Sequence, residues 1–425
     1  MTPPQHPGDQ QVEPTEFLRS YPMRLLTAAL GDSIRPTQAQ LDTYLKYAEV
    51  CDPAADNLVA AMRNLPKGSG RNQFEQALEH GIDTVADPLP ELTVFFETLE
   101  ATPYWVDFGK IALAGRTISR IPARSLLATA ASMVFPWSYL ASRANQVLIR
   151  SGDLDEKAAA RIVESLSWLI DCASPGAMSR FSEGFKSTAR VRLIHGYARA
   201  GINSLDDWDY AQWDVPVNQS QQMITWVVII LPGVLVPVLG HLVGPREAMA
   251  VLHLLRYMGH LLGIRPELQI SSVRDLMRIV WLAGWYEFKP DEFSPRLADA
   301  AYSAIPAFQG LPTRGPLAGP VQWAVRRMHT DLSFLVLGPR HRKILGVPML
   351  SPMLLALPLI TVKNLVTDIA AVVAAGGTAK LARKRGQRQR AEIKRLSREL
   401  KANLTYNREN AKLRTVPSAP VALAQ

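Results

Sequence analysis

The stretch FKSTARVRLIHGYARA, residues 185–200, sets the character of this 425-residue chain. Its apolar residues recur at three- and four-residue spacing and do not alternate as in a strand, so the stretch predicts an α-helix. At about 100° per residue, Thr188, Arg192 and Arg199 all lie within about 60° of His195 on a helical wheel. Four polar side chains therefore share one narrow face of this helix.

That polar face has two interpretations. If it is exposed, it is an ordinary solvated face. Apolar residues such as Leu193 occupy much of the remaining circumference, and this favours a helix buried on most sides. Two buried guanidiniums would need anionic partners. A haem fits this pattern, because His195 can give a neutral imidazole to iron while an arginine one turn away pairs with a propionate.

The same helical periodicity continues on both sides of this stretch. It predicts helices over residues 41–50, 56–65, 123–150, 155–172, 219–243, 247–262 and 272–288. The long helix 123–150 is expected to kink at Pro136. No internal repeat or flexible linker divides the run. We therefore predict an all-α protein with a single large helical domain over 16–345, preceded by a disordered stretch 1–15.

The composition of the chain excludes some other kinds of metal and cofactor site. The chain is 48% hydrophobic, which is ample for a large core. Its two cysteines, Cys51 and Cys172, belong to no paired spacing, which excludes a four-cysteine zinc site and covalent c-type haem attachment. The first fifteen residues show no secretory pattern, so we expect a cytoplasmic protein, with peripheral membrane attachment as an alternative.

The C-terminal part differs from the domain before it. An apolar, proline-interrupted segment over 346–378 is not expected to span a membrane, and attachment of this region to the surface of an anionic membrane is the alternative. The basic helical tail 379–425 carries most of the net charge of +9, because 380–414 alone holds thirteen Lys or Arg against three Glu. Its apolar stripe of Ile393, Leu396, Leu400 and Leu404 predicts packing on the protein itself, with docking on an anionic membrane through 380–414 as the alternative. Aromatic residues do not interleave with the basic ones, so nucleic acid is not the expected partner.

Several short motifs follow one another in a specific order. They are Asp52-Pro-Ala-Ala-Asp56, Pro103-Tyr-Trp-Val-Asp107, Pro175-Gly176, the His195 helix itself, Val215-Pro-Val-Asn-Gln219 followed by Thr225, and Leu254-Leu-Arg-Tyr-Met-Gly-His-Leu-Leu-Gly263. Together, over about residues 45–345, they resemble the latex clearing protein (rubber oxygenase) family, which includes the mycophenolic-acid pathway oxygenase.

The resemblance implies an all-helical fold with a globin-like core, haem b as cofactor, and His195 as the proximal iron ligand. It also implies that Thr188, Arg192, Arg199 and Thr225 lie beside the haem. The family's distal Arg-x-x-Lys-Thr corresponds here to Arg161, Glu164 and Ser165. Because glutamate is a poor sixth ligand for ferrous haem, this departure predicts an open distal site.

A further departure is Asn145, which stands near the position of the family's acidic general base. The resemblance thus implies an oxygenase that acts with O2 on an unsaturated, lipophilic, isoprenoid-like small molecule. Glu164 is a substitute acid or base, or simply an exposed helix charge. The alternatives are a haem-binding sensor or carrier without turnover, a haem peroxidase that uses Arg161 and Glu164, and a structural helical protein with a basic tail.

Overall fold

Polar caps mark where several helices begin. Thr37 and Gln40 form a reciprocal capping box at the start of α2 (Gln38–Lys46). Asp52 accepts a hydrogen bond from the backbone N–H of Ala55 at the start of α3 (Pro53–Arg63). Asp107 caps α6 (Phe108–Arg120) in the same way. These carboxylates and hydroxyls satisfy backbone donors that a helix leaves unpaired at its first turn.

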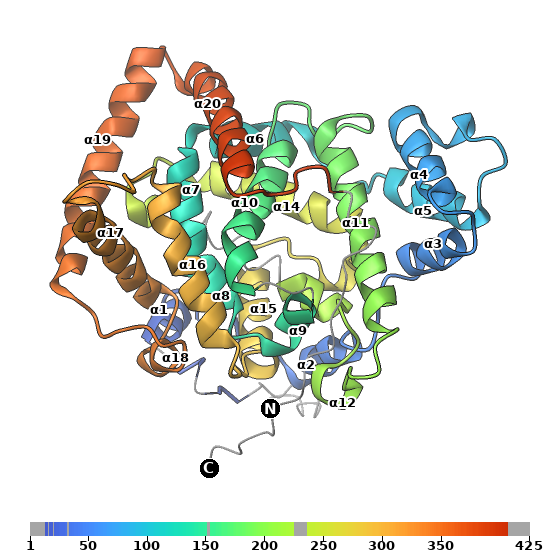
Figure 1. Cartoon of the computed structure of the whole chain (residues 1–425), viewed down its shortest axis with the longest axis horizontal. Helices are drawn as coiled ribbons and strands as arrows, with labels where there is room; N and C mark the ends of the chain where they lie inside the picture. Colours follow the sequence, from blue (N-terminus) through green and yellow to red (C-terminus); the bar gives the residue numbers. More distant parts are fainter. Residues whose placement is uncertain are drawn as a thin grey trace, which may run out of the picture.

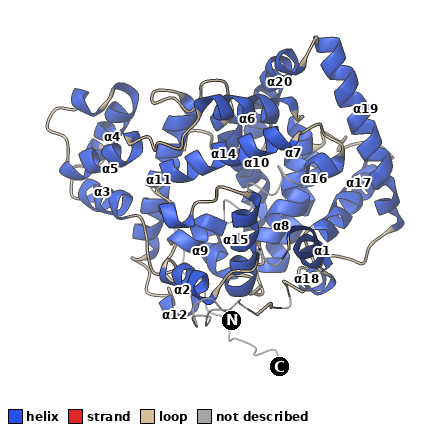
Figure 2. Ribbon diagram, turned by 180° about the vertical axis from the view of Figure 1, so that it is seen from behind, coloured by secondary structure: helices blue, strands red, loops and turns tan. Residues whose placement is uncertain are grey.

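The chain is seen here as a computed structural model that describes residues 13–15, 17–19, 21–31, 34–150, 154–224 and 236–406. Helices connected by turns make up this part of the chain, and it contains no β-strand, so the predicted all-α class is confirmed (Figure 2). The remaining helices are α1 (Tyr21–Leu30), α4 (Ser69–His80), α5 (Pro90–Glu100), α7 (Ala123–Thr129), α8 (Phe135–Ser138), α9 (Ser142–Arg150), α10 (Leu154–Cys172), α11 (Glu183–Ile202), α12 (Tyr210–Trp213), α14 (Pro245–Leu261), α15 (Val273–Tyr286), α16 (Ser294–Phe308), α17 (Ala318–Leu332), α18 (Pro339–Ile344), α19 (Leu357–Ala375) and α20 (Thr378–Glu399).

One apolar core runs through the molecule. Helix α10 lies at its centre, against α11, α16 and α20, and α6 packs between α14 and α20. In Figures 1 and 2, α3, α4 and α5 stand at one end, and α17 and α19 stand at the other. The two ends are thus joined through the central helices that carry most of the predicted site residues.

The stretch predicted as one helix over 123–150 is broken into several pieces. After α7 the backbone widens into a π-helical turn over Ala130–Val134, and α8 follows directly. Pro136 lacks an N–H and its ring crowds the carbonyl four residues earlier, so a wider turn at this point relieves the clash. A second break after Ser138 separates α8 from α9. The predicted kink is therefore present, but the helix does not continue as one element.

The basic tail helix α20 packs on α6 and α10. Ile393 and Leu396 of the predicted stripe are buried in the common core, while most of its basic residues stay exposed. Within the described residues, the tail therefore packs on the protein itself, which is the first of the two arrangements expected from the sequence. The predicted helix 219–243 is helical up to residue 224 and forms a 3-10 turn over Val236–Leu239, and its middle lies outside the described residues.

Candidate functional site

The helical hairpin of α10 and α11 is closed tightly at one end. The indole Nε1 of Trp168 donates to Thr188 Oγ1 at 3.2 Å, and Thr188 donates to the carbonyl of Gly184 at 2.7 Å. A Cβ on Gly184 would lie 2.7 Å from the Cα of Cys172, so only glycine permits this approach. Thr188, predicted to line the site, thus lies at the closed end, with its hydroxyl bonded within the hairpin.

His195 lies further along the same hairpin, at the level of Arg161. The helices run antiparallel, because a short connection joins them and Trp168 contacts Thr188. Seven residues separate Trp168 from Arg161 and Thr188 from His195, which is about 10 Å along each axis. The hairpin therefore brings Arg161 to the level of His195, and Ser165, which is exposed, lies between that level and the closed end. The guanidinium of Arg161 donates to the carbonyl of Leu148 at 3.5 Å.

The imidazole of His195 is neutral at physiological pH. Burial and, to a smaller extent, the nearby charge of Arg199 lower its pKa to about 4, against the opposite effects of the Gln222 side chain and the charge of Asp52. Its Nδ1 is buried without a hydrogen-bond partner in the described part of the chain, although the residue as a whole is only partly buried. A neutral imidazole with a ring nitrogen not engaged by the protein is the chemical form that binds a haem iron.

Gln222 is a neighbour of His195 that sequence reasoning did not identify. Its Nε2 donates to the carbonyl of Val217 at 3.3 Å, and its Oε1 is buried with no partner among the described residues. An amide oxygen beside a ring nitrogen is an acceptor for the imidazole N–H. Such an acceptor fixes the tautomer and orientation of a metal-binding histidine. The signal available in the sequence was only its closeness to the motif that ends at Gln219.

The two arginines of the polar face have their anionic partners on α3. Arg192 binds both carboxylate oxygens of Asp52, with Nε–Oδ2 at 2.6 Å and Nη2–Oδ1 at 2.9 Å, and donates through Nη1 to Thr98. Arg199 Nε lies 2.6 Å from Asp56 Oδ1. The buried guanidiniums therefore do not require a propionate. Arg199 keeps one buried donor, Nη2, without a partner in the described residues, so its predicted role toward a cofactor remains a prediction.

The other residues predicted to line the haem site either bond to other parts of the protein or lie outside the described residues. Glu164 accepts a hydrogen bond from the backbone N–H of Asn403 at 2.7 Å, which ties the segment after α20 to α10. Asn145 is buried and donates to the carbonyl of Ser138 at 3.2 Å. Thr225 lies outside the described residues. The structure thus brings Arg161 and Ser165 toward the level of His195 and engages Glu164 with the C-terminal segment.

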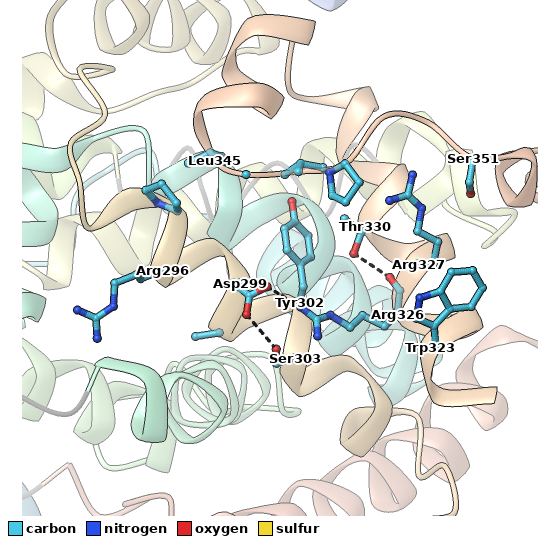
Figure 3. Close-up of a pocket in the computed structure, with 15 residues that line it drawn as sticks. Arg296, Asp299, Tyr302, Ser303, Trp323, Arg326, Arg327, Thr330, Leu345 and Ser351 are labelled. Carbon is cyan, nitrogen blue, oxygen red and sulfur yellow. Dashed lines mark hydrogen bonds and ion pairs between the residues drawn. The ribbon is translucent and has the colours of Figure 1, made fainter. Parts of the chain in front are cut away.

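A separate hollow of about 1020 Å³ lies between α16, α17 and the segment 345–351 (Figure 3). Arg296, Asp299 and Tyr302 come from α16, and Trp323, Arg326 and Arg327 come from α17. None of the predicted site residues lines this hollow. It is therefore a different feature from the hairpin that carries His195.

The fold and the hairpin together define a class of helical oxygenase. The solved structure of latex clearing protein in the closed state covers 80% of this chain, and the chain covers 91% of it, with a TM-score of 0.55 and 15% sequence identity. Residues 123–362, more than half of the chain, match the family model described as "ER-bound oxygenase mpaB/B'/Rubber oxygenase, catalytic domain". The chain belongs to this family and is an oxidoreductase of the oxygenase type. Comparison with curated proteins gives no match.

Proposed function

We propose that the chain is a haem b-dependent oxygenase in which His195 holds the iron and O2 oxidises an unsaturated lipophilic substrate of isoprenoid type. The observation that carries the proposal is the neutral imidazole of His195, whose buried Nδ1 has no hydrogen-bond partner in the described part of the chain, at the level of Arg161 on the neighbouring helix. Family membership supplies the reaction class. When bound, a histidine-ligated haem supplies the binding and activation of O2.

The surrounding residues fit this group. Gln222 raises the pKa of His195 as a side-chain hydrogen-bond partner, so its Oε1 would accept the N–H of the ring nitrogen that does not hold the iron. Arg199 Nη2 is an unused donor suited to a propionate, whereas Arg192 is fully engaged by Asp52 and positions α11 on α3. Arg161 and Ser165 supply hydrogen-bond donors on the opposite helix.

The proposed substrate class follows from the relatives. The names of the matching structure and family refer to latex and to rubber, which point to a polyisoprene-like substrate. Buried apolar residues of α7 and the following turn, among them Leu126, Leu127 and Met133, provide a hydrophobic environment close to α10. A small isoprenoid-like molecule is therefore the substrate we propose for this chain.

A second candidate is a haem-binding sensor or carrier without turnover. It is favoured by two contacts, because Glu164 is engaged with Asn403 and the position of the family's base is occupied by Asn145, which donates to Ser138. Neither side chain is then free to move a proton at the site. Oxygen consumption separates this candidate from the oxygenase.

The test is reconstitution of the purified full chain with haem, followed by its visible spectrum and by O2 uptake with squalene. We expect a Soret band that His195→Ala abolishes or shifts, and O2 uptake that depends on squalene. His253→Ala is the matched control, because His253 accepts a hydrogen bond from Asp107 N and belongs to neither helix of the hairpin. An unchanged Soret band in His195→Ala would contradict iron ligation. A normal Soret band without O2 uptake would favour the carrier, and turnover with H2O2 alone would indicate a peroxidase.

A further inference from the structure

Helix α19 is a long apolar helix that the rest of the protein scarcely covers. With the preceding turn it forms the segment Pro352–Ala375, in which an 18-residue stretch has a mean hydropathy of 1.6 and only 6% of its residues are buried. Within the described residues, it is the one helix long and apolar enough to cross a membrane. Figures 1 and 2 show α19 along one edge of the molecule, at the end opposite α3, α4 and α5. An apolar helix of this length is ordinarily covered by other parts of the protein, by a partner or by lipid.

The exposed face of α19 is a regular apolar stripe. Its large side chains follow one another at spacings of four, three, four, three and four residues, which keeps them on one side of a helix. They are between 48% and 78% exposed, namely Leu355, Leu359, Val362, Val366, Ile369 and Val373. The residues beside the stripe are also small or apolar and exposed, including Pro358, Leu365, Ala370 and Ala374. The exposed face is therefore broad as well as long.

The opposite face of α19 is polar and is bonded to the segment 236–242. Thr361 Oγ1 donates to the carbonyl of Val238 at 2.9 Å, and Asn364 Nδ2 donates to that of Leu239 at 2.8 Å. The carboxylate of Asp368 lies 3.0 Å from His241 Nδ1 and 2.6 Å from Arg385 Nη1. These contacts hold the middle of α19, from Thr361 to Asp368, against the protein, with its apolar face outward.

This arrangement excludes a spanning orientation of the folded protein. To cross a bilayer, α19 would have to leave the segment 236–242 and break the contacts of Asp368. It would also carry Lys363 and Asp368 into the hydrocarbon, where charged side chains are costly. We propose instead that α19 lies in the plane of a lipid bilayer, with the exposed stripe from Leu355 to Val373 immersed and the protein body above it.

Lipid fits this face better than a second copy of the chain does. Paired helices usually flank an apolar seam with charged residues on both sides, and here Lys363 is the one charged residue beside the stripe, among small and apolar neighbours. The apolar surface continues through Met349 and Leu350, which are 90% and 51% exposed. Directly after α19 come exposed Lys380, Arg383 and Lys384, whose charge complements anionic headgroups. The docking surface is thus assigned to α19, and the basic residues add electrostatic attraction to anionic headgroups.

The first test is flotation of the full chain with vesicles of phosphatidylcholine, with and without added phosphatidylserine. We expect binding to both, and tighter binding with phosphatidylserine. Val366→Glu/Val373→Glu should reduce the bound fraction about tenfold or more. The control Val94→Glu/Val273→Glu changes two valines of comparable exposure on α5 and α15 and should float like the parent. Equal loss in both double variants, or no flotation of the parent, would overturn the proposal.

The second test separates in-plane docking from spanning and from self-association. The variants Lys343→Cys and Lys380→Cys, which place an exposed thiol before and after the segment Pro352–Ala375, are each made in a Cys51→Ser background that leaves only the buried Cys172, and are labelled with a membrane-impermeant maleimide on sealed vesicles. In-plane docking predicts that both react from outside. Protection of either position would overturn that geometry.

Sedimentation without lipid is the third measurement, and a dimer that Val366→Glu/Val373→Glu dissociates would assign the face to a second copy. None of these readouts needs haem, so the proposal stands apart from the proposed function.

Discussion

Asp52 and Arg192 lie 140 residues apart in the sequence and form a two-point ion pair between the start of α3 and the middle of α11. Both side chains are almost completely buried, at 5% and 4% exposure. Burial alone would raise the pKa of Asp52, but the hydrogen bonds and charge of Arg192 hold it below its ordinary value. The pair therefore fixes the helix of His195 against α3.

Asp52→Asn should be strongly destabilising. It removes the countercharge of a buried arginine, and breaking such a pair costs about 3–5 kcal/mol. Asp299→Asn is the matched control, because the Asp299–Arg326 pair is largely exposed and its loss should cost at most about 1 kcal/mol. Chemical denaturation of the parent and both variants measures the difference. Equal losses would show that the buried pair contributes no more than a surface pair.

Gly184→Ala should open the closed end of the hairpin. The new Cβ would lie 2.7 Å from both Cys172 Cα and the carbonyl oxygen of Ala177, and backbone atoms cannot move aside cheaply. We expect a loss of about 1–3 kcal/mol or more. Gly319→Ala on α17 meets nothing within 4 Å and should be neutral or stabilising by up to about 1 kcal/mol. Thermal unfolding of the two variants checks the contrast, and a stable Gly184→Ala protein would contradict the tight packing.

Glu287 should make the protein less stable as the pH rises from about 4.5 to 8. Burial and, to a smaller extent, the charge of Asp214 raise its pKa to about 8, although the charge of Arg143 opposes both. Below about 4.5 the carboxyl is protonated in the folded and unfolded states alike. Between 4.5 and 8 only the unfolded state loses the proton, so folding becomes less favourable over this range.

Glu287→Gln tests this effect, since glutamine keeps the shape and does not titrate. The variant should gain stability over the parent increasingly from pH 5 to pH 8, as measured by melting temperature across this range. The difference between the two proteins is the informative quantity, because buried histidines such as His329, with its pKa lowered to about 4 by burial, give an opposite trend in both. Parallel melting curves at every pH would contradict a protonated Glu287.

The sequence predicted single helices well and their partners poorly. The expected helices 155–172 and 185–200 correspond closely to α10 and α11, because their periodicity is strong and local. The helical wheel placed Arg192 and Arg199 beside His195, but it contains no information on Asp52 and Asp56, which reach them from another helix. The wheel therefore suggested that a haem propionate neutralises these arginines, whereas the protein supplies the aspartate side chains of α3 and its N-cap.

The C-terminal prolines also show that a local sequence pattern does not determine the tertiary structure. In the sequence, Pro352 and Pro358 interrupt the apolar segment and argue against a long helix. In the structure each stands in the first residues of an element, where no intrahelical N–H bond is lost, and α19 then continues to Ala375. Which face of α19 is covered depends on hydrogen bonds to residues 236–242, which no local pattern reveals.

Glu164→Lys should convert an open distal site into a closed one. In the parent, Glu164 is held by the backbone N–H of Asn403 and does not supply a sixth iron ligand, so the ferrous, haem-loaded protein should bind CO and O2 readily. A lysine cannot accept that hydrogen bond, and it restores the residue type of the family's distal motif. The variant should therefore show a six-coordinate, low-spin spectrum and slower CO binding. Glu164→Gln keeps an acceptor for Asn403 without adding a ligand and should behave like the parent. A parent that is already six-coordinate through a protein side chain would contradict the open site, whatever the behaviour of the two variants.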